Sequence, residues 1–507
     1  MRNDPKNRSL PVGWVRAKVE QVCLVNPRTF AVPLSDNCEV SFVPMAAIEA
    51  ETGVIDLSQI KLFGDVKKGY TKFSDGDVLF AKITPCMENG KIAIANGLKN
   101  GSACGTTELH VLRPFPGLSR EYLRFFLLRT DFRKQAQRNM AGTAGQLRVP
   151  AWFIEQAHIP LPPHPEQRRI VAEIEKQFTR LEAAEAALRR IEVNLKRYRA
   201  SVLKAASEGK LVPTEAELAE AEGRDYEHAE QLLERILVER RARWESQEKR
   251  RGKYREPVPP DTSDLSELPA GWIWSNIGEA FEVFVGATPR RSRPEYWGGD
   301  ISWVSSSEVA FNRIKNTREC TTEEGLNNSS MDLHPPGTVL LGMIGEGKTR
   351  GQVSILDISA CNSQNSAAIR ASQSKLPPEY LFYYLWGQYD VTRQIGSGNN
   401  QPALNKSRVQ EIPFPVPPIG EQHRIVAEVE SRLSIIQQAE TTVEICAKRV
   451  GRLRQSILNQ AFSGQLVPQD SCDEPASTLL ERIKTEREAA RSSKASRPRP
   501  TRRRSRK

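Results

Sequence analysis

The chain has 507 residues, of which 39% are hydrophobic and 27% charged, and its formal net charge is +11. This length suits about three or four domains of a soluble protein, and no apolar run reaches the ~18 residues of a membrane span. The polar start MRNDPKNRSL is no signal peptide, so we expect a cytoplasmic protein without a membrane partner. Eight cysteines without a Cys-x-x-Cys pair, beside six histidines, argue against a metal site and predict free thiols.

Residues 10–165 are expected to form a globular segment that mixes strands and helices. Strand-like runs such as 77–83 alternate with turns, and a helical stretch is predicted at 120–138. Four prolines between 160 and 165 then end this pattern. A helix of 43 residues is predicted from Glu166 to Glu208, because Gly209 follows it. We expect this helix and a shorter one to fill a helical region at 166–256.

Residues 257–269 are rich in proline and polar residues and predict a linker to a second globular segment at 270–420. A strand is expected there at 338–344 and a helical stretch at 378–395. A second helical region is expected at 421–490 and opens with another long helix. Residues 491–507 carry nine Lys or Arg and no acid, which predicts a disordered tail that attracts phosphates whatever their sequence.

One heptad position is apolar along the whole of both long helices. The residues at this position are Ile174, Leu181, Leu188, Leu195 and Val202 in the first helix and Val429, Ile436, Val443, Val450 and Ile457 in the second. An apolar repeat of seven residues over about five heptads lets two helices pack along a seam. We therefore expect the two helices to pair as an antiparallel coiled coil.

The two halves of the chain are copies of one pattern. Residues 160–175 (PLPPHPEQRRIVAEIE) and 415–430 (PVPPIGEQHRIVAEVE) are identical at eleven of sixteen positions, at an offset of 255. The pairs LPVGW and LPAGW at 10 and 268, and EYLRFFL and EYLFYYL at 121 and 379, follow at an offset of 258. The expected fold is therefore a tandem repeat of an α/β segment and a long helix.

Two patterns imitate catalytic sites. The run from Gly342 to Thr349 fits G-x-x-x-x-G-K-[ST], but a phosphate loop needs a helix after it, and 350–356 indicates a strand. A hairpin loop is expected there. Asp332, Glu346 and Lys348 imitate a magnesium-dependent nuclease triplet, but the first half has no counterpart. We expect no catalytic residue and no metal site.

Basic, glycine-rich loops are the best candidates for contacts to nucleic acid. Arginine and lysine bind phosphates and guanine edges, and glutamine pairs with adenine. Gln146 and Gln401 occupy corresponding places at an offset of 255. The full set of candidates is Lys82, Lys91, Gln146 and Arg148 in the first half and Thr288, Arg290, Arg291, Arg293, Lys348, Arg350, Gln401 and Lys406 in the second.

These motifs together resemble the specificity subunits of type I restriction–modification systems. The resemblance covers about residues 10–490 and depends most on the two Pro-Pro-x-x-Glu-Gln motifs at 162–167 and 417–422. Gly286-x-Thr288-Pro289 also resembles the opening of a recognition domain of that family. The first half departs from it, with Asn26-Pro27-Arg28.

The resemblance implies that each globular segment is a target-recognition domain that reads one half of a bipartite, asymmetric site in double-stranded DNA. The helices would form a spacer and a docking surface for two methyltransferase subunits, which bring S-adenosylmethionine. Motor-nuclease subunits would bring ATP and Mg²⁺, and this chain would bind no cofactor itself. Two alternatives stay open: an enzyme acting through the Lys348 loop, and a coiled-coil scaffold that binds proteins but no DNA.

Overall fold

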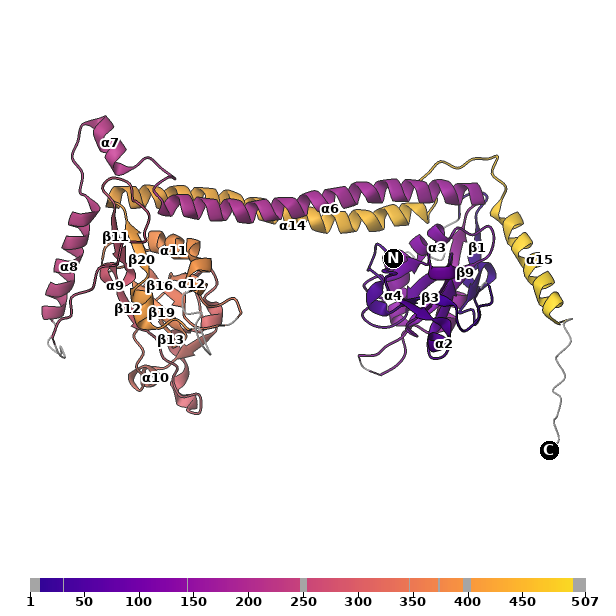
Figure 1. Ribbon diagram of the computed structural model, residues 1–507, viewed down its shortest axis with the longest axis horizontal. Coiled ribbons are helices and arrows are strands. Elements are labelled where there is room, and N and C mark those ends of the chain that lie inside the picture. Colours follow the sequence, from indigo (N-terminus) through magenta and orange to yellow (C-terminus); the bar gives the residue numbers. More distant parts are fainter. Residues whose placement is uncertain are drawn as a thin grey trace. The chain divides into compact units, whose positions relative to one another are not determined.

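The computed structural model describes residues 10–30, 32–143, 145–246, 253–345, 347–372, 374–394 and 403–495, and the side chains up to residue 488. The chain forms two compact units (Figure 1). The first comprises residues 1–188 and 445–507, and the second comprises residues 189–444. Because these limits fall inside the long helices, the domain boundaries expected from the sequence stay predictions.

The first unit contains two four-stranded sheets, with strand orders β2-β9-β6-β7 and β4-β3-β8-β5, and the antiparallel pair β1-β10. Its strands are β1 (Val15–Lys18), β2 (Cys23–Val25), β3 (Glu39–Val43), β4 (Ile60–Leu62), β5 (Thr71–Ser74), β6 (Val78–Ala81), β7 (Ile92–Ile94), β8 (Ser102–Gly105), β9 (Leu109–Pro114) and β10 (His158–Leu161). Its helices are α1 (Val19–Val22), α2 (Phe63–Val66), α3 (Arg120–Leu128), α4 (Thr130–Arg138), α5 (Ala151–Gln156) and α15 (Ala476–Ala495), with the first part of α6 (His164–Ser207) and the last part of α14 (Ile419–Ala461).

The second unit has a five-stranded sheet, β12-β19-β16-β17-β14, a three-stranded sheet, β15-β13-β18, and the pair β11-β20. Its strands are β11 (Ile273–Asn276), β12 (Glu282–Val285), β13 (Trp297–Val304), β14 (Asn312–Ile314), β15 (Glu319–Thr321), β16 (Thr338–Gly342), β17 (Val353–Leu356), β18 (Ala360–Asn362), β19 (Ser366–Arg370) and β20 (Pro413–Val416). Its helices are α7 (Glu215–Glu222), α8 (Ala229–Glu245), α9 (Ile277–Ala280), α10 (Glu323–Asn327), α11 (Pro378–Gly387), α12 (Tyr389–Gln394) and α13 (Lys406–Gln410), with the remainder of α6 and α14.

The two units share most of one sheet topology, as the repeat predicts, because the order β2-β9-β6-β7 of the first matches β12-β19-β16-β17 of the second. Among the described strands, β5 and β14 have no counterpart in the other unit. The strands β6 and β7 are antiparallel neighbours, as are β16 and β17, and β3 lies parallel to β8 as β13 does to β18. The predicted strands at 77–83 and 338–344 correspond to β6 and β16, whose residues are all buried. The mixed α/β fold in tandem is therefore confirmed.

The helical stretch predicted at 120–138 is two helices instead of one. Arg129 has an extended backbone and separates α3 from α4. The first backbone amide of α4, at Thr130, donates a hydrogen bond of 2.8 Å to the side chain of Gln455 on α14. This contact with a residue distant in the sequence is invisible to local periodicity. The second stretch, at 378–395, divides in the same way into α11 and α12, with Gln388 between them.

The Glu-Gln pair of each repeated motif is buried at the start of a long helix. In the first unit, the indole of Trp14 donates to Glu166 at 3.0 Å, and the amide of Gln167 donates to the carbonyl oxygen of Pro162 at 3.1 Å. In the second unit, Gln422 donates to the carbonyl oxygen of Pro417 at 2.8 Å. A buried polar side chain needs such partners, so the motif fixes how each helix leaves its globular part.

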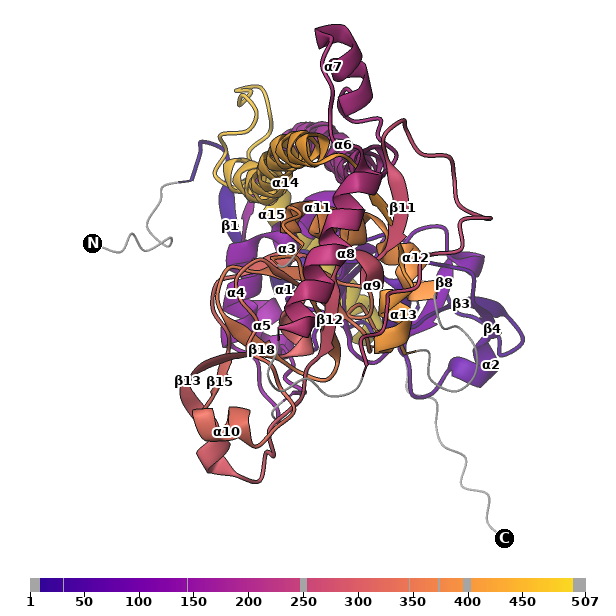
Figure 2. The ribbon, with the colours of Figure 1, turned by 90° about the vertical axis from the view of Figure 1, so that its left-hand side faces the viewer.

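The long helices α6 and α14 lie side by side within each unit (Figures 1 and 2). Ile174 and Ile457 share a core in the first unit, and Val202 and Val429 share one in the second. Of the ten heptad residues, Leu181, Leu188 and Leu195 are half-buried and the other seven are buried.

An ion pair joins the two helices in each unit. Arg199 contacts Glu440 at 2.8 Å in the second unit, and Arg454 contacts Glu185 at 3.5 Å in the first. On α6, Glu185 comes 14 positions before Arg199, and on α14, Arg454 comes 14 positions after Glu440. Each of these shifts equals two heptads.

The segment that follows each long helix packs on a globular part of the other half of the sequence. After α6, the backbone amide of Ala229 at the start of α8 donates to the carbonyl oxygen of Gly271 at 2.9 Å. Figure 2 shows α8 in front of this part. After α14, the amide of Ala476 at the start of α15 donates to the carbonyl oxygen of Gly13 at 2.8 Å. The glycine of each Leu-Pro-x-Gly-Trp motif thus accepts a hydrogen bond from the first residue of one of these helices.

The end of the chain differs from its prediction. The helix α15 continues to Ala495, so the first residues of the predicted tail at 491–507 are helical, and the rest lies outside the described residues. Among the helices that the structure describes, none combines the length and apolar character that crossing a membrane requires.

A substitution of Gly286, which directly follows β12, tests how tightly the second globular part is packed. A Cβ atom at this position would lie 1.9 Å from the carbonyl oxygen of Asn362, which accepts a hydrogen bond from the amide of Ala287. We expect Gly286→Ala to destabilise the second unit by about 1–3 kcal/mol, because overpacking forces the backbone apart. Thermal unfolding measures the loss. Gly347→Ala is the control, since its Cβ would meet no heavy atom within 4 Å. Equal melting temperatures for the two variants would contradict the packing.

Candidate nucleic-acid interface

The first unit has a positively charged groove of about 570 Å³ on its surface. The residues that line it are Asn26, Pro27, Arg28, Tyr70, Thr71, Lys72, Lys82, Thr107, Leu109, His110, Arg148, Val149, Pro150 and Ala151. Four of them are cationic and none is acidic. They come from β5 and the turn before it, from β9, from the segments that follow β2, β6 and β8, and from the residues around the start of α5. A groove of one charge sign with exposed backbone and aromatic edges suits a polyanion.

Lys82 and Arg148, both predicted from the sequence, line this groove. The backbone of Lys82 donates to Glu108 at 3.0 Å and accepts from Val149 at 2.8 Å, which brings three distant segments together. Arg148 makes two 2.9 Å hydrogen bonds to the carboxylate of Glu108. These bonds lower the pKa of Glu108, so the pair is charged at neutral pH. Lys82 is therefore the better candidate for a phosphate contact.

His110 forms part of the groove without acting as an acid or base. Its Nε2 lies 2.8 Å from the carbonyl oxygen of Val149, so this nitrogen carries the proton. Its Nδ1 accepts from the amide of Asn26 at 3.0 Å. Burial, assisted by the charge of Lys82, lowers the pKa of His110 and keeps the ring neutral. The ring, on β9, thus joins the segment after β2 to the segment before α5.

Two further candidates of the first half lie elsewhere. Lys91 is half-buried and its ammonium donates to the carbonyl oxygen of Met45 at 2.8 Å, so it holds a loop. Gln146 is exposed in the turn before Arg148. Sequence reasoning missed Lys72 and Tyr70 as groove residues, because they come from β5 and the turn before it, and no local signal connects them with Lys82.

In the second unit, the loop after β12 carries Thr288 and three arginines. Arg291 forms a two-point ion pair with Glu319, and its guanidinium lies 3.9 Å from the ring centroid of Trp297. The carboxylate raises the pKa of Arg291 further. Arg291 therefore holds the loop, although it is exposed, as Arg290 is too. Arg293 pairs with Glu295 at 3.2 Å.

The phosphate-loop pattern is a hairpin loop, as expected. The strands β16 and β17 on either side of it are antiparallel. The residues directly after Thr349 form a turn that leads into β17 and not into a helix. Lys348 is exposed. The expectation for Arg350 is corrected, because this residue is only 8% exposed and its guanidinium donates to the carbonyl oxygen of Arg393 on α12 at 2.7 Å.

The remaining predicted residues of this half fall into two groups. Lys406 is exposed at the start of α13, with its ammonium 5.9 Å from the ring centroid of Phe284. Gln401 and Glu346 lie outside the described residues. Within the described part of the chain, no cluster of three or more His, Cys, Asp or Glu side chains is arranged to hold a metal ion.

The two units build the same backbone frame with different side chains. In the second unit, the amide of Met343 donates to Asn365 at 2.8 Å, and Leu404 donates to Met343 at 3.0 Å. These bonds repeat those of Lys82 with Glu108 and Val149. Methionine and asparagine therefore stand where the first unit has lysine and glutamate. The same frame thus carries a half-buried lysine in the first unit and a buried methionine in the second.

A polar cluster is buried inside the second unit. His334 donates from Nε2 to Asn362 at 3.0 Å, and its Nδ1 accepts from Arg370 at 3.1 Å. The amide of Asn362 donates to the carbonyl oxygen of Ser366 at 2.8 Å. Burial, with the nearby charge of Arg370, lowers the pKa of His334 to about 4. The ring is neutral at physiological pH.

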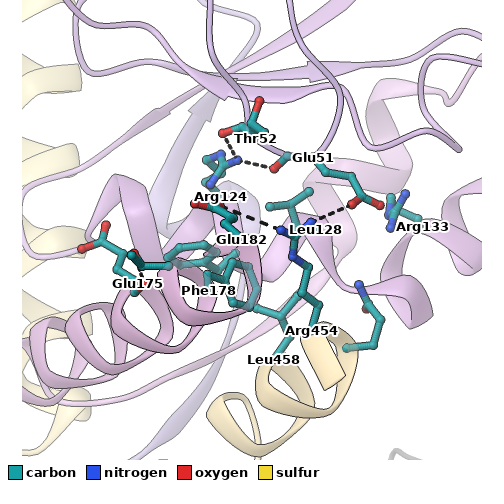
Figure 3. A pocket seen from close by; sticks show the side chains of 13 residues that line it. Glu51, Thr52, Arg124, Leu128, Arg133, Glu175, Phe178, Glu182, Arg454 and Leu458 are labelled. Atoms are coloured by element: carbon teal, nitrogen blue, oxygen red, sulfur yellow. Dashed lines mark hydrogen bonds and ion pairs between the residues drawn. The ribbon is translucent and has the colours of Figure 1, made fainter. Parts of the chain in front are cut away.

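A partly open pocket of about 180 Å³ lies between the globular part of the first unit and its long helices (Figure 3). Arg454 of α14 reaches Glu51 at 3.2 Å, and Arg124 of α3 donates to the backbone carbonyl oxygens of Glu51 and Thr52. Burial lowers the pKa of Arg124 to about 10, which leaves it charged. The charged side chains that line the pocket connect the globular part to the helices.

The chain matches the family model for the type I restriction modification DNA specificity domain in two regions, residues 11–192 and 269–444. These regions cover more than half of the chain. The chain therefore belongs to the type I restriction–modification specificity subunits and contains two specificity domains.

Curated relatives match over most of their length. The specificity subunits of the EcoAI and EcoEI type I restriction enzymes of Escherichia coli are 27% and 26% identical, each over 91% of this chain and 84% of the relative. The EcoKI specificity subunit of Escherichia coli strain K12 is 25% identical over 96% of this chain and 98% of its own length.

Two solved structures share the fold. One comes from a study of complex assembly and conformational transition of the type I R-M system, with a TM-score of 0.63, 21% identity and coverage of 90% of this chain and all of that chain. The other is the HsdS subunit from Thermoanaerobacter tengcongensis, with a TM-score of 0.51, 22% identity and coverage of 92% and 100%.

His334 makes the stability of the second unit depend on pH. Its pKa is about 4 when folded and about 6.5 when exposed, so the unfolded state binds more protons between these values. Stability is lost as the pH falls, by about 2 kcal/mol at pH 5. His334→Gln removes the proton uptake and should flatten this part of the pH curve. Chemical denaturation of both proteins at pH 7, 6 and 5 measures the difference, and parallel curves would contradict the buried neutral ring.

Proposed function

We propose that this chain is the sequence-recognition subunit of a type I restriction–modification enzyme and that each globular part reads one half of a bipartite, asymmetric site in double-stranded DNA. The observation that carries the proposal is the repeated backbone frame with different side chains around Lys82 and Met343. One frame gives both domains the same way to approach a duplex, and the different side chains give them different half-sites.

The chain contributes recognition and no catalysis. Two methyltransferase subunits supply S-adenosylmethionine and methylate adenine, and motor-nuclease subunits supply ATP hydrolysis and Mg²⁺-dependent cleavage. The membership in the family and the hairpin at Lys348 support this division of labour. The chain acts with these partners in the cytoplasm.

The long helices form an antiparallel coiled coil that serves as spacer and as docking surface for the methyltransferase subunits. The burial of the heptad residues and the two ion pairs 14 residues apart support the pairing. The helix α6 has 44 residues, which at 1.5 Å per residue gives about 66 Å. This exceeds the ~34 Å of one turn of duplex DNA and leaves room for partner subunits.

Replacing one recognition domain tests the proposal. Residues 268–415 are exchanged for the second domain of another specificity subunit, and the methylated sites are mapped in host DNA that carries the methyltransferase subunits. We expect one half-site to change and the other to stay. A simultaneous change in both halves would contradict two independent domains. An unmethylated genome with a well-folded complex that binds no duplex DNA would favour the scaffold alternative.

A heptad insertion tests the spacer. Seven residues are added to α6 after Leu188 and to α14 before Val443, which keeps the apolar seam in register. The addition lengthens the pair by about 10 Å, or at most about 3 bp of duplex. The unread gap between the half-sites should lengthen while the bases read at each end stay the same.

An insertion of four residues at the same places is the control for the heptad. It breaks the heptad phase and should impair assembly more than the longer insertion does. Methylation mapping gives the gap, and gel filtration with the methyltransferase subunits gives assembly. A seven-residue variant that assembles and methylates with an unchanged gap would show that the helices do not set the spacing.

A further inference from the structure

The same short loop occurs in both globular parts, where it connects two strands that are consecutive in the chain and belong to different sheets. Residues 106–108 connect β8 to β9, and residues 363–365 connect β18 to β19. Both loops have three residues, and the central ones, Thr107 and Gln364, are exposed. The sequence does not suggest this correspondence, because the two loops read Thr-Thr-Glu and Ser-Gln-Asn.

Backbone hydrogen bonds hold the first and third residues of both loops in the same way. The amide of Thr106 donates to Val43, the last residue of β3, at 3.1 Å, and Ser363 donates to Val304, the last residue of β13, at 3.0 Å. The third residue, Glu108 or Asn365, accepts from the first residue after β6 or β16. Because these bonds use only backbone atoms, the side chain of the central residue is free to vary.

In the second unit, the side chain of Gln364 is already oriented. The hydroxyl of Thr288 donates to its Oε1. Thr288 is its one side-chain partner in the part of the chain that the structure describes. The amide nitrogen keeps both of its hydrogens for a ligand, and the oxygen keeps a second lone pair. Adenine offers the matching pair in the major groove, an acceptor at N7 and a donor at N6.

In the first unit, the central residue stands among cations. Thr107 lines the groove together with Arg28, Lys82 and Arg148. Basic side chains of this kind bind phosphates, and those phosphate contacts fix the position of a duplex without reading its sequence. A threonine at the centre of such a site offers a hydroxyl to a base edge and a methyl group to the thymine methyl.

We propose that Thr107 and Gln364 are equivalent specificity-determining residues, one in each recognition domain, and that Gln364 reads an adenine with the help of Thr288. The inference depends on the proposed function, since it assigns the base contact within each half-site. The loop frame holds the position and the central side chain sets the base. Thr288 is a positioning residue, because it acts through Gln364.

The test uses the full chain assembled with its methyltransferase subunits. Duplexes that contain the mapped target, with each base pair varied in turn, compete for binding, and the relative affinity is measured at every position. Gln364→Ala should lower the preference for one A·T pair in one half-site by roughly 5- to 150-fold. All other positions should keep their preferences. Thr107→Ala should change one position in the other half-site.

Substitutions at Thr288 separate positioning from direct contact. Thr288→Val removes the hydroxyl and keeps the shape, so it should weaken the preference at the same base pair as Gln364→Ala, by a smaller factor. Thr288→Ser restores the hydroxyl and should restore the preference. In the double variant with Gln364→Ala, the valine should have no further effect at that base pair, because the side chain through which it acts is gone.

Three results overturn the inference. The first is that the base preferences of Gln364→Ala equal those of the wild-type chain at every position. The second is that the variant binds all duplexes more weakly by one common factor, which marks a phosphate contact. The third is that Thr107→Ala and Gln364→Ala change the same half-site. A wild-type complex that prefers no duplex over another would instead refute the proposed function and is distinguished by that measurement on the unaltered chain.

Discussion

The rest of this structure depends on buried glutamate and glutamine side chains at the start of each long helix. Burying an unpaired amide or carboxylate is costly, so Gln167 and Gln422 must each find a carbonyl oxygen, and Glu166 binds the indole of Trp14. These bonds close only when the first strand of the globular part, the proline turn and the helix are all in place. Burial also raises the pKa of Glu166 and Glu421. The direction in which each helix leaves its globular part is thus fixed by polar contacts.

Local spacing in the sequence was sufficient to predict the repeat, the long helices and the hairpin at Lys348. The helices and the hairpin depend on residues close together in the chain, and the repeat depends on short stretches that recur at an offset of 255. The groove was only partly predictable, because Lys72 and Lys82 meet Arg148 across more than 60 residues. Charge alone also misled for Arg350, which is buried and whose partner is the carbonyl oxygen of Arg393. It did not reveal that Arg291 pairs with Glu319. A basic residue in a glycine-rich loop has the same appearance whether it binds a ligand or its own fold.

The separation of frame from side chain is what lets one fold present two surfaces. The bonds that shape the loops around Thr107 and Gln364 join backbone atoms, which every residue except proline possesses. Substitutions at the central position therefore cost the fold little. The buried cluster of His334, Asn362 and Arg370 differs, because its side chains bond to one another and a change in one alters the partners of the others.

The way the chain is divided between the two units has a consequence for the order in which the protein folds. The second unit is one continuous stretch, residues 189–444, whereas the first joins residues 1–188 to residues 445–507. Phe462 packs against Tyr122, and Ala476 bonds to Gly13, so the first unit needs the last segment of the chain to complete its core. During synthesis from the N-terminus, the globular part made first must wait, with apolar surface uncovered, until the ribosome has finished the one made second. The amino-terminal half of this protein is thus the last to become native.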